Sequence, residues 1–170
     1  MRRECRSKIL VAAILPSLLG LPSGARAATN PLRALPVSDA RVAELAREGA
    51  QRRLRSSECR KVLDDYADGQ GRPLSEKLSV FGVPPDEYLG MLPFLDGASR
   101  PLCEAGQSQL LTTAGTARVF VCKPFLETVR DRRATAEVYV IHEMLHTLGL
   151  GENPPTSQEI TQQVIRRCAP

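Results

Sequence analysis

The segment from residue 133 to residue 148 constrains the fold of this 170-residue chain more than any other. Its apolar residues recur at the three- and four-residue spacing of a helix, and the core stripe consists of Val138, Ile141, Leu145 and Leu148. Further apolar residues on the opposite side indicate that the helix is buried on most faces. Gly149 follows the last periodic residue and can adopt the left-handed conformation that ends a helix. The sequence therefore predicts a long buried helix that ends at about residue 148.

The only two histidines of the chain lie on this helix, four residues apart, and a glutamate directly follows the first. His142 and His146 share one helix face, so both imidazoles can reach one metal ion. Glu143 lies about 100° around the helix from His142, a position suited to acting on metal-bound water rather than to binding the metal. This HExxH pattern is typical of a zinc site with a general base. The alternative is a buried structural helix whose histidines form hydrogen bonds with carbonyls or water. Such a role does not require the two histidines to flank a glutamate at this spacing.

The first 27 residues have the features of a cleavable export signal. A basic leader precedes the apolar run Ile9–Leu21, and Ala25-Arg26-Ala27 supplies a small-x-small cleavage pattern. The apolar run is shorter than the stretch of about 20 residues that a transmembrane helix needs. We therefore expect residues 1–27 to be a signal peptide and residues 28–170 to form one domain. The protein is expected in the periplasm or outside the cell, without a membrane anchor.

The positive net charge of the chain belongs to this leader. Residues 1–27 carry five basic side chains and one acidic side chain, whereas the whole chain carries 23 basic and 19 acidic ones. Removal of the leader thus leaves 18 of each and a formal net charge of zero. A role in binding nucleic acid or an anionic membrane loses its main support.

Cleavage also removes Cys5 and leaves four cysteines. An even number of cysteines in an exported chain indicates two disulfides. Three pairings are possible, and we favour Cys59–Cys103 with Cys122–Cys168, which pairs the cysteines within each half of the chain. Metal binding by these cysteines is the alternative, but none of them has CxxC spacing.

The rest of the chain is expected to be mostly helical with a small sheet. Helices are predicted over residues 38–65, 74–81 and 84–92, with a last helix after Thr156, and strands over 94–95, 108–113 and 116–122. The last two strands flank an Ala-Gly pair and are expected to form a hairpin. Thr156 and Glu159 have the spacing of a capping box at the start of the last helix.

A hairpin followed by an HExxH helix resembles the zincin superfamily of zinc metallopeptidases, over about residues 117–160. The resemblance implies a minimal zincin-like α+β domain, in which a small sheet packs on the HExxH helix. It also implies that His142 and His146 bind Zn²⁺, that Glu143 activates the zinc-bound water, and that an edge strand upstream holds the substrate extended. Residues 116–122 form the best strand near the site.

The function expected from this resemblance is that of an exported zinc-dependent peptidase. Its partner would be an extended peptide or protein substrate rather than nucleic acid, and the protein is expected to be a monomer. Two alternatives remain open: a zinc amidase acting on cell-wall peptides, and a non-enzymatic, disulfide-stapled binding module with a degenerate or structural metal site. The intact Glu143 disfavours the binding module, because a structural site needs no such carboxylate.

The third zinc ligand has to be a carboxylate, because no third histidine exists and the cysteines are expected to be paired. The only acidic residues after His146 are Glu152 and Glu159. Glu152 stands where the metzincin branch places its third ligand, although that branch normally uses His or Asp there and has a downstream methionine that this chain lacks. Glu159 resembles the ligand of the gluzincin branch, but the capping box already explains it. We favour Glu152 and keep Glu159 as the alternative.

The group that stabilises the developing oxyanion cannot be a histidine in this chain. Tyr66, Tyr88 and several arginines are candidates. Tyr139 lies one helical turn before His142 on the same side and can pack beside the site, although a tyrosine on a helix is more often a residue at the edge of the core.

Overall fold

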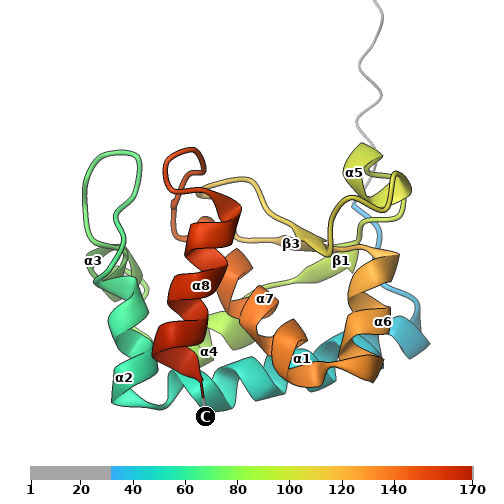
Figure 1. Cartoon of the computed structure of the whole chain (residues 1–170), viewed down its shortest axis with the longest axis horizontal. Coiled ribbons are helices and arrows are strands. Elements are labelled where there is room, and N and C mark those ends of the chain that lie inside the picture. Colours follow the sequence, from blue (N-terminus) through green and yellow to red (C-terminus); the bar gives the residue numbers. More distant parts are fainter. Residues whose placement is uncertain (1–31, 170) are drawn as a thin grey trace, which may run out of the picture.

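The computed structural model describes residues 32–169, so the expected signal peptide lies outside the described residues. The fold is mixed α/β, mostly helical with a three-stranded sheet (Figure 1). In chain order the elements are α1 (Val37–Leu54), α2 (Ser57–Arg60), the 3-10 helix η1 (Lys61–Leu63), α3 (Leu74–Ser79), α4 (Pro85–Met91), β1 (Phe94–Asp96), α5 (Pro101–Glu104), β2 (Leu110–Leu111), β3 (Val119–Val121), α6 (Lys123–Asp131), α7 (Arg133–Thr147) and α8 (Ser157–Cys168).

Most elements lie where the sequence predicts them, but the short helix α5 was not predicted, and two further differences concern longer helices. The helix expected over residues 38–65 is divided after α1, because the Ser56 hydroxyl accepts hydrogen bonds from the backbone N–H groups of Glu58 and Cys59 and so caps a new helix, α2. Helix α6 was not predicted. Its start signal is Pro124 in the first turn, where a missing N–H costs nothing.

The sheet has the strand order β1-β3-β2. Strand β1 pairs with β3 in parallel, and β2 pairs with β3 in the antiparallel direction, with Leu110 opposite Val121. The predicted hairpin is therefore confirmed, although its strands are shorter than expected. Because β3 lies in the centre, β2 forms one edge of the sheet.

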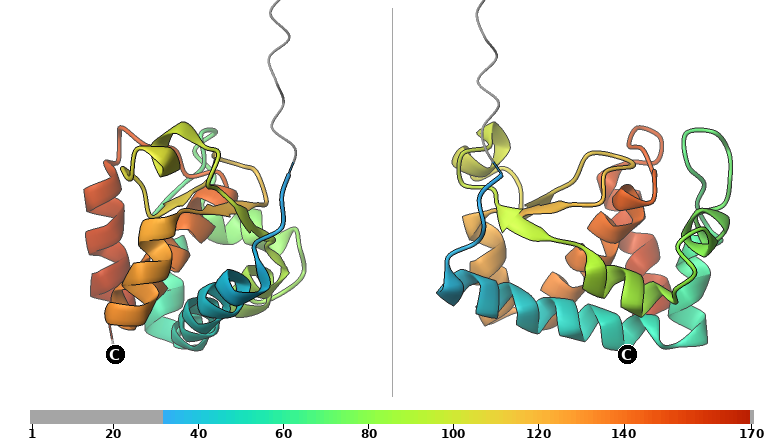
Figure 2. Two further views of the ribbon diagram at one scale, coloured as in Figure 1. Left: turned by 90° about the vertical axis from the view of Figure 1, so that its right-hand side faces the viewer. Right: turned by 180° about the vertical axis from the view of Figure 1, so that it is seen from behind.

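Helix α7 occupies the centre of the molecule. It contacts α1, α6, α8 and strand β2, while α1 runs along the opposite side of α7 from the sheet (Figures 1 and 2). The stripe residues Ile141, Leu145 and Leu148 are fully buried, and so is Met144. The prediction that this helix is buried on most faces is confirmed, and the core that surrounds it fixes the orientation of its two histidines.

The predicted disulfide pairing was wrong. Cys59 is bonded to Cys168, and Cys103 is bonded to Cys122. Helix α2 packs against α8, which brings Cys59 and Cys168 together across 109 residues of sequence. Cys103 on α5 lies beside the end of β3, where Cys122 follows. The first bond thus ties α8 to α2 rather than to the sheet.

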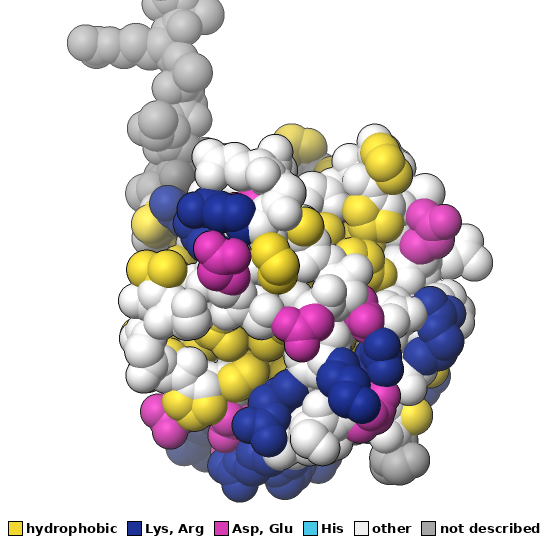
Figure 3. Space-filling model, turned by 90° about the vertical axis from the view of Figure 1, so that its left-hand side faces the viewer, with side chains coloured by type: hydrophobic (Ala, Val, Ile, Leu, Met, Phe, Trp, Pro, Cys, Tyr) yellow, Lys and Arg dark blue, Asp and Glu magenta, His cyan; other side chains and the backbone are white. Residues whose placement is uncertain are grey.

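The surface beside α2, α3 and α8 carries basic and acidic side chains interspersed (Figure 3). Arg167 on α8 pairs with Asp65 and Glu58, with N–O distances of 2.7 Å in both cases. The Arg167 hydrogen bond holds the pKa of Asp65 below its usual value. Among the described residues, no helix is both long and apolar enough to cross a membrane. Two disulfides are compatible with secretion.

Candidate metal site and its groove

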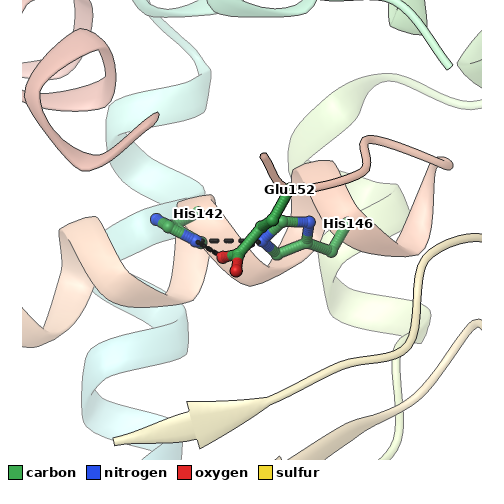
Figure 4. A group of neighbouring side chains, drawn as sticks. All are labelled: His142, His146 and Glu152. Carbon is green, nitrogen blue, oxygen red and sulfur yellow. Dashed lines mark hydrogen bonds and ion pairs between the residues drawn. The ribbon is translucent and has the colours of Figure 1, made fainter. Parts of the chain in front are cut away.

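Three ligand atoms converge at the C-terminal end of α7 (Figure 4). The Nε2 atoms of His142 and His146 are 3.0 Å apart, and Oε1 of Glu152 lies 3.7 and 3.3 Å from them, respectively. In a tetrahedral zinc site with bonds of about 2.0–2.1 Å, ligand atoms are about 3.3 Å apart. The spacing agrees to within a few tenths of an ångström, so this group can hold a metal ion.

The other ring nitrogen of each histidine has a partner of its own. Nδ1 of His146 lies 2.7 Å from the carbonyl oxygen of Leu150, and Nδ1 of His142 lies 2.9 Å from the hydroxyl of Thr161 on α8. A carbonyl only accepts hydrogen bonds, so Nδ1 of His146 carries the proton and its Nε2 lone pair faces the cluster. Partners of this kind orient histidine ligands in metal sites.

The end of α7 explains why Glu152 reaches the histidines. Gly149 has a φ of 111°, its N–H donates to the carbonyl of His146, and the N–H of Leu150 donates to the carbonyl of Leu145. These two bonds form a Schellman motif, which reverses the chain directly after the helix. The turn places the Leu150 carbonyl against His146 and returns Glu152 to the cluster.

Glu159 lies elsewhere. Its Oε2 accepts hydrogen bonds from the backbone N–H and the hydroxyl of Thr156, at 2.8 and 2.9 Å, and completes the predicted capping box. The same bonds lower the pKa of the Glu159 carboxyl. The structure therefore groups Glu152, and not Glu159, with the two histidines.

Burial shifts the pKa of His142 and that of Glu143. His142 and His146 are only 4% and 6% exposed. Desolvation, followed by the proximity of His146, lowers the pKa of His142 to about 3, so its ring is neutral and able to bind a metal. Burial raises the pKa of the Glu143 carboxyl to about 6, and Glu152 adds to this shift, whereas His146 and the hydroxyl of Thr112 oppose it.

Two adjoining cavities of about 420 and 390 Å³ flank Glu143. The first lies beside His142, and the second lies beside His146 and Glu152. Glu143, Leu110 of β2 and Ser157 at the start of α8 line both. A single groove therefore runs between the edge of the sheet and the start of α8, and it crosses Glu143 next to the metal-binding group.

The backbone of the edge strand β2 pairs with β3 on one side. The N–H of Cys122 donates to the carbonyl of Gln109, so residues 109 and 111 face β3 and Leu110 faces away from it. The strand expected nearest the substrate, residues 116–122, contains β3, which is bonded on both sides. The open edge beside the site is instead β2, because the central position of β3 leaves it no free side.

Of the three tyrosines considered near the site, the fold places two away from the groove and one in its lining. The Tyr88 hydroxyl is buried and bonded to Thr147 at 3.0 Å, and the Tyr66 hydroxyl donates to the carbonyl of Glu159. Neither lines the groove, whereas Tyr139 lines the cavity beside His142. No lysine or arginine of the described chain lines either cavity.

Comparison with known proteins identified no relative: no protein-family model matches the chain, and neither the curated proteins nor the solved structures searched contain a match. Function is therefore inferred from the residues of the site.

Proposed function

We propose that this protein is an exported zinc-dependent peptidase of the zincin type. Its zinc ligands would be His142, His146 and Glu152, and Glu143 would be the general base. The observation that carries the proposal is the position of Glu143. It lies beside three converging ligand atoms without being one of them, and it lines both cavities of the groove.

The ligand set supports zinc. Two imidazole nitrogens and one carboxylate are the ligands of many catalytic zinc sites, which keep a further position for water or substrate. A structural zinc site generally has four protein ligands, and cysteines usually supply several of them. Here the four cysteines of the described chain are all in disulfides. The binding-module alternative is therefore disfavoured.

The chain's own groups supply the remaining chemistry of hydrolysis. A bound zinc ion supplies a Lewis acid that polarises the scissile carbonyl and acidifies water. The Glu143 carboxylate accepts a proton from the attacking water, whose oxygen bonds to the carbonyl carbon. Glu143 then delivers that proton to the amide nitrogen as the carbon–nitrogen bond breaks. The N–H and C=O of Leu110, which do not pair with β3, would hold the peptide as an added strand.

Replacement of Glu143 by Gln tests this proposal. The variant keeps the size of the side chain but cannot accept a proton, so zinc content should stay at one per chain while hydrolysis of an unfolded protein falls by at least about 10²-fold. Glu127 is an exposed glutamate on α6, and Glu127→Gln makes the same chemical change away from the groove. This control should keep full activity. Unchanged hydrolysis in Glu143→Gln contradicts the proposal.

A further inference from the structure

The cavity beside His142 is lined by an unusual share of glutamines. The chain has seven glutamines, and four of them line this cavity. Gln107 and Gln109 lie just before β2, and Gln158 and Gln162 lie on the first turns of α8. The amides thus come from two segments that are far apart in sequence, one on each side of the groove.

These amides keep most of their hydrogen-bonding capacity. Within the described part of the chain, the side chains of Gln107, Gln158 and Gln162 form no hydrogen bond, and Oε1 of Gln109 accepts one bond from Thr128. Each amide carries two donors and one acceptor oxygen. The cavity therefore offers many donors and acceptors to a ligand.

Charge is nearly absent from the same cavity. Charged residues make up 25% of the chain, yet Glu143 is the only Asp, Glu, Lys or Arg among the described residues that line this space. Hydroxyl groups complete the lining, from Ser108, Tyr139 and Thr161 among others. Apart from Glu143, which the proposed reaction requires, no Asp, Glu, Lys or Arg among the described lining residues would pair with a charged side chain that entered and lost its hydration. An aliphatic side chain would cover polar groups without bonding them.

The second cavity of the groove has a different lining. Beyond Glu143, on the side of His146, the wall includes aliphatic side chains from Leu102, Leu111 and Leu150, and no glutamine is among the described residues that line it. The two ends of the groove therefore present different chemistry to a substrate that passes over Glu143.

On the basis of the proposed function, we infer that the cavity beside His142 is a specificity pocket for an uncharged hydrogen-bonding side chain. Glutamine and asparagine fit this description, because a carboxamide pairs both donors and acceptors of the lining. The pocket would receive the side chain of a residue next to the scissile bond. Gln107, Gln158 and Gln162 are exposed, so each hydrogen bond to the ligand replaces one to water and adds a modest preference.

Binding of peptide hydroxamates to the zinc-loaded protein tests this inference without requiring turnover. Two series place the chelating group at either end of a short peptide, and the neighbouring residue is Gln, Leu, Glu or Lys. In one series the Gln compound should bind about 5- to 10-fold more tightly than the others, as expected for one or two additional hydrogen bonds. The double variant Gln158→Leu/Gln162→Leu should lose this preference. Gln70→Leu, at an exposed loop residue outside the groove, should retain it.

The outcomes separate the pocket from the peptidase. The pocket assignment is overturned if all four side chains bind equally, if the Lys or Glu compound binds most tightly, or if no hydroxamate binds. It is also overturned if the double variant keeps the preference. A Gln preference that the double variant abolishes supports it, even if no peptide is hydrolysed, in which case only the peptidase proposal fails. Hydrolysis without any side-chain preference leaves the peptidase proposal intact and removes the pocket.

Discussion

Helix α7 buries ionisable side chains at two levels along its axis, and the partners of these side chains differ between the two levels. At the first level, Glu137 is 9% exposed and accepts a 2.7 Å hydrogen bond from Nε of Arg53. Arg53 also donates to the carbonyl of Cys168, which anchors the guanidinium. Gly49 of α1 makes room for the Glu137 side chain, because a Cβ there would lie 2.1 Å from its Oε1.

At the second level, the buried groups face one another rather than an opposite charge. His142 and His146 direct their Nε2 atoms at the same point as Glu152, and Glu143 lies beside them in the groove. The nearby cavities contain no lysine or arginine among the described residues that line them.

The difference distinguishes two reasons for burying charge. At the first level, which we call closed, the donor and the acceptor of the Glu137–Arg53 pair both come from the protein. The second level, which we call open, is the cluster at His142. It faces a groove, and its two imidazole nitrogens and one carboxylate oxygen suit a cation. Buried ionisable groups of the second kind are candidates for function, whereas the first kind is explained by packing alone.

Removal of one histidine should have the largest effect and is specific to the open level. His146→Ala removes one of three ligands, so zinc affinity should fall by more than about 100-fold, since even loss of an outer partner typically costs 10- to 100-fold. Glu137→Gln, at the closed level, should leave zinc binding unchanged. Competition with a chelator gives both affinities. Stoichiometric zinc in His146→Ala at the wild-type affinity would place the metal elsewhere.

Glu152 and Glu159 should respond in opposite ways to substitution by alanine. Glu152→Ala should weaken zinc binding by about 100-fold, because it removes a ligand. Glu159→Ala removes only the capping box, which costs about 1 kcal/mol of folding free energy, and zinc should stay bound. Elemental analysis and thermal unfolding distinguish the two. If Glu159→Ala is the variant that loses zinc, the site has the gluzincin-like arrangement.

The features predicted correctly from sequence are those encoded locally. The buried stripe of α7, the capping box at Thr156 and the hairpin depend on residues a few positions apart. Glu152, which the structure groups with the two histidines, was also predicted from its short spacing from His146, and the Schellman turn at Gly149 gives that spacing its geometry.

The features missed depend on contacts between distant segments. The pairing of Cys59 with Cys168 follows from the packing of α2 on α8, which no local pattern encodes. Likewise, the hydroxyl of Thr161 faces His142 only because α8 packs beside α7. The glutamines of the groove are scattered in sequence, so their convergence was not predictable from spacing.

Substitution of Gly49 should disrupt the closed level. The change should lower the free energy of unfolding and leave zinc binding unchanged. Gly49→Ala would drive a Cβ into the Glu137 side chain, so we expect a loss of about 1–3 kcal/mol in unfolding free energy, typical of overpacking. In a Glu137→Ala background the same change should instead stabilise by up to about 1 kcal/mol, through helix propensity. Denaturant unfolding of the four proteins in this cycle measures the sign. Destabilisation of equal size in both backgrounds would show that Glu137 is not the obstacle.

The smallest effect is expected for Thr161, a residue of α8 whose hydroxyl contacts His142 of the open level. Thr161 offers its hydroxyl to Nδ1 of His142 at 2.9 Å, and this partner orients the ring with Nε2 toward the cluster. Thr161→Val keeps the shape but removes the hydroxyl, so zinc affinity should fall by about 10-fold, the lower end for loss of a partner behind a ligand. Thr161→Ser keeps the hydroxyl and should bind zinc within about twofold of the wild-type protein. Chelator competition at constant pH resolves a tenfold change, which corresponds to about 1.4 kcal/mol. Equal affinities for the Val and Ser variants would mean that core packing alone holds His142 in place, and the open level would then depend on the same kind of support as the closed one.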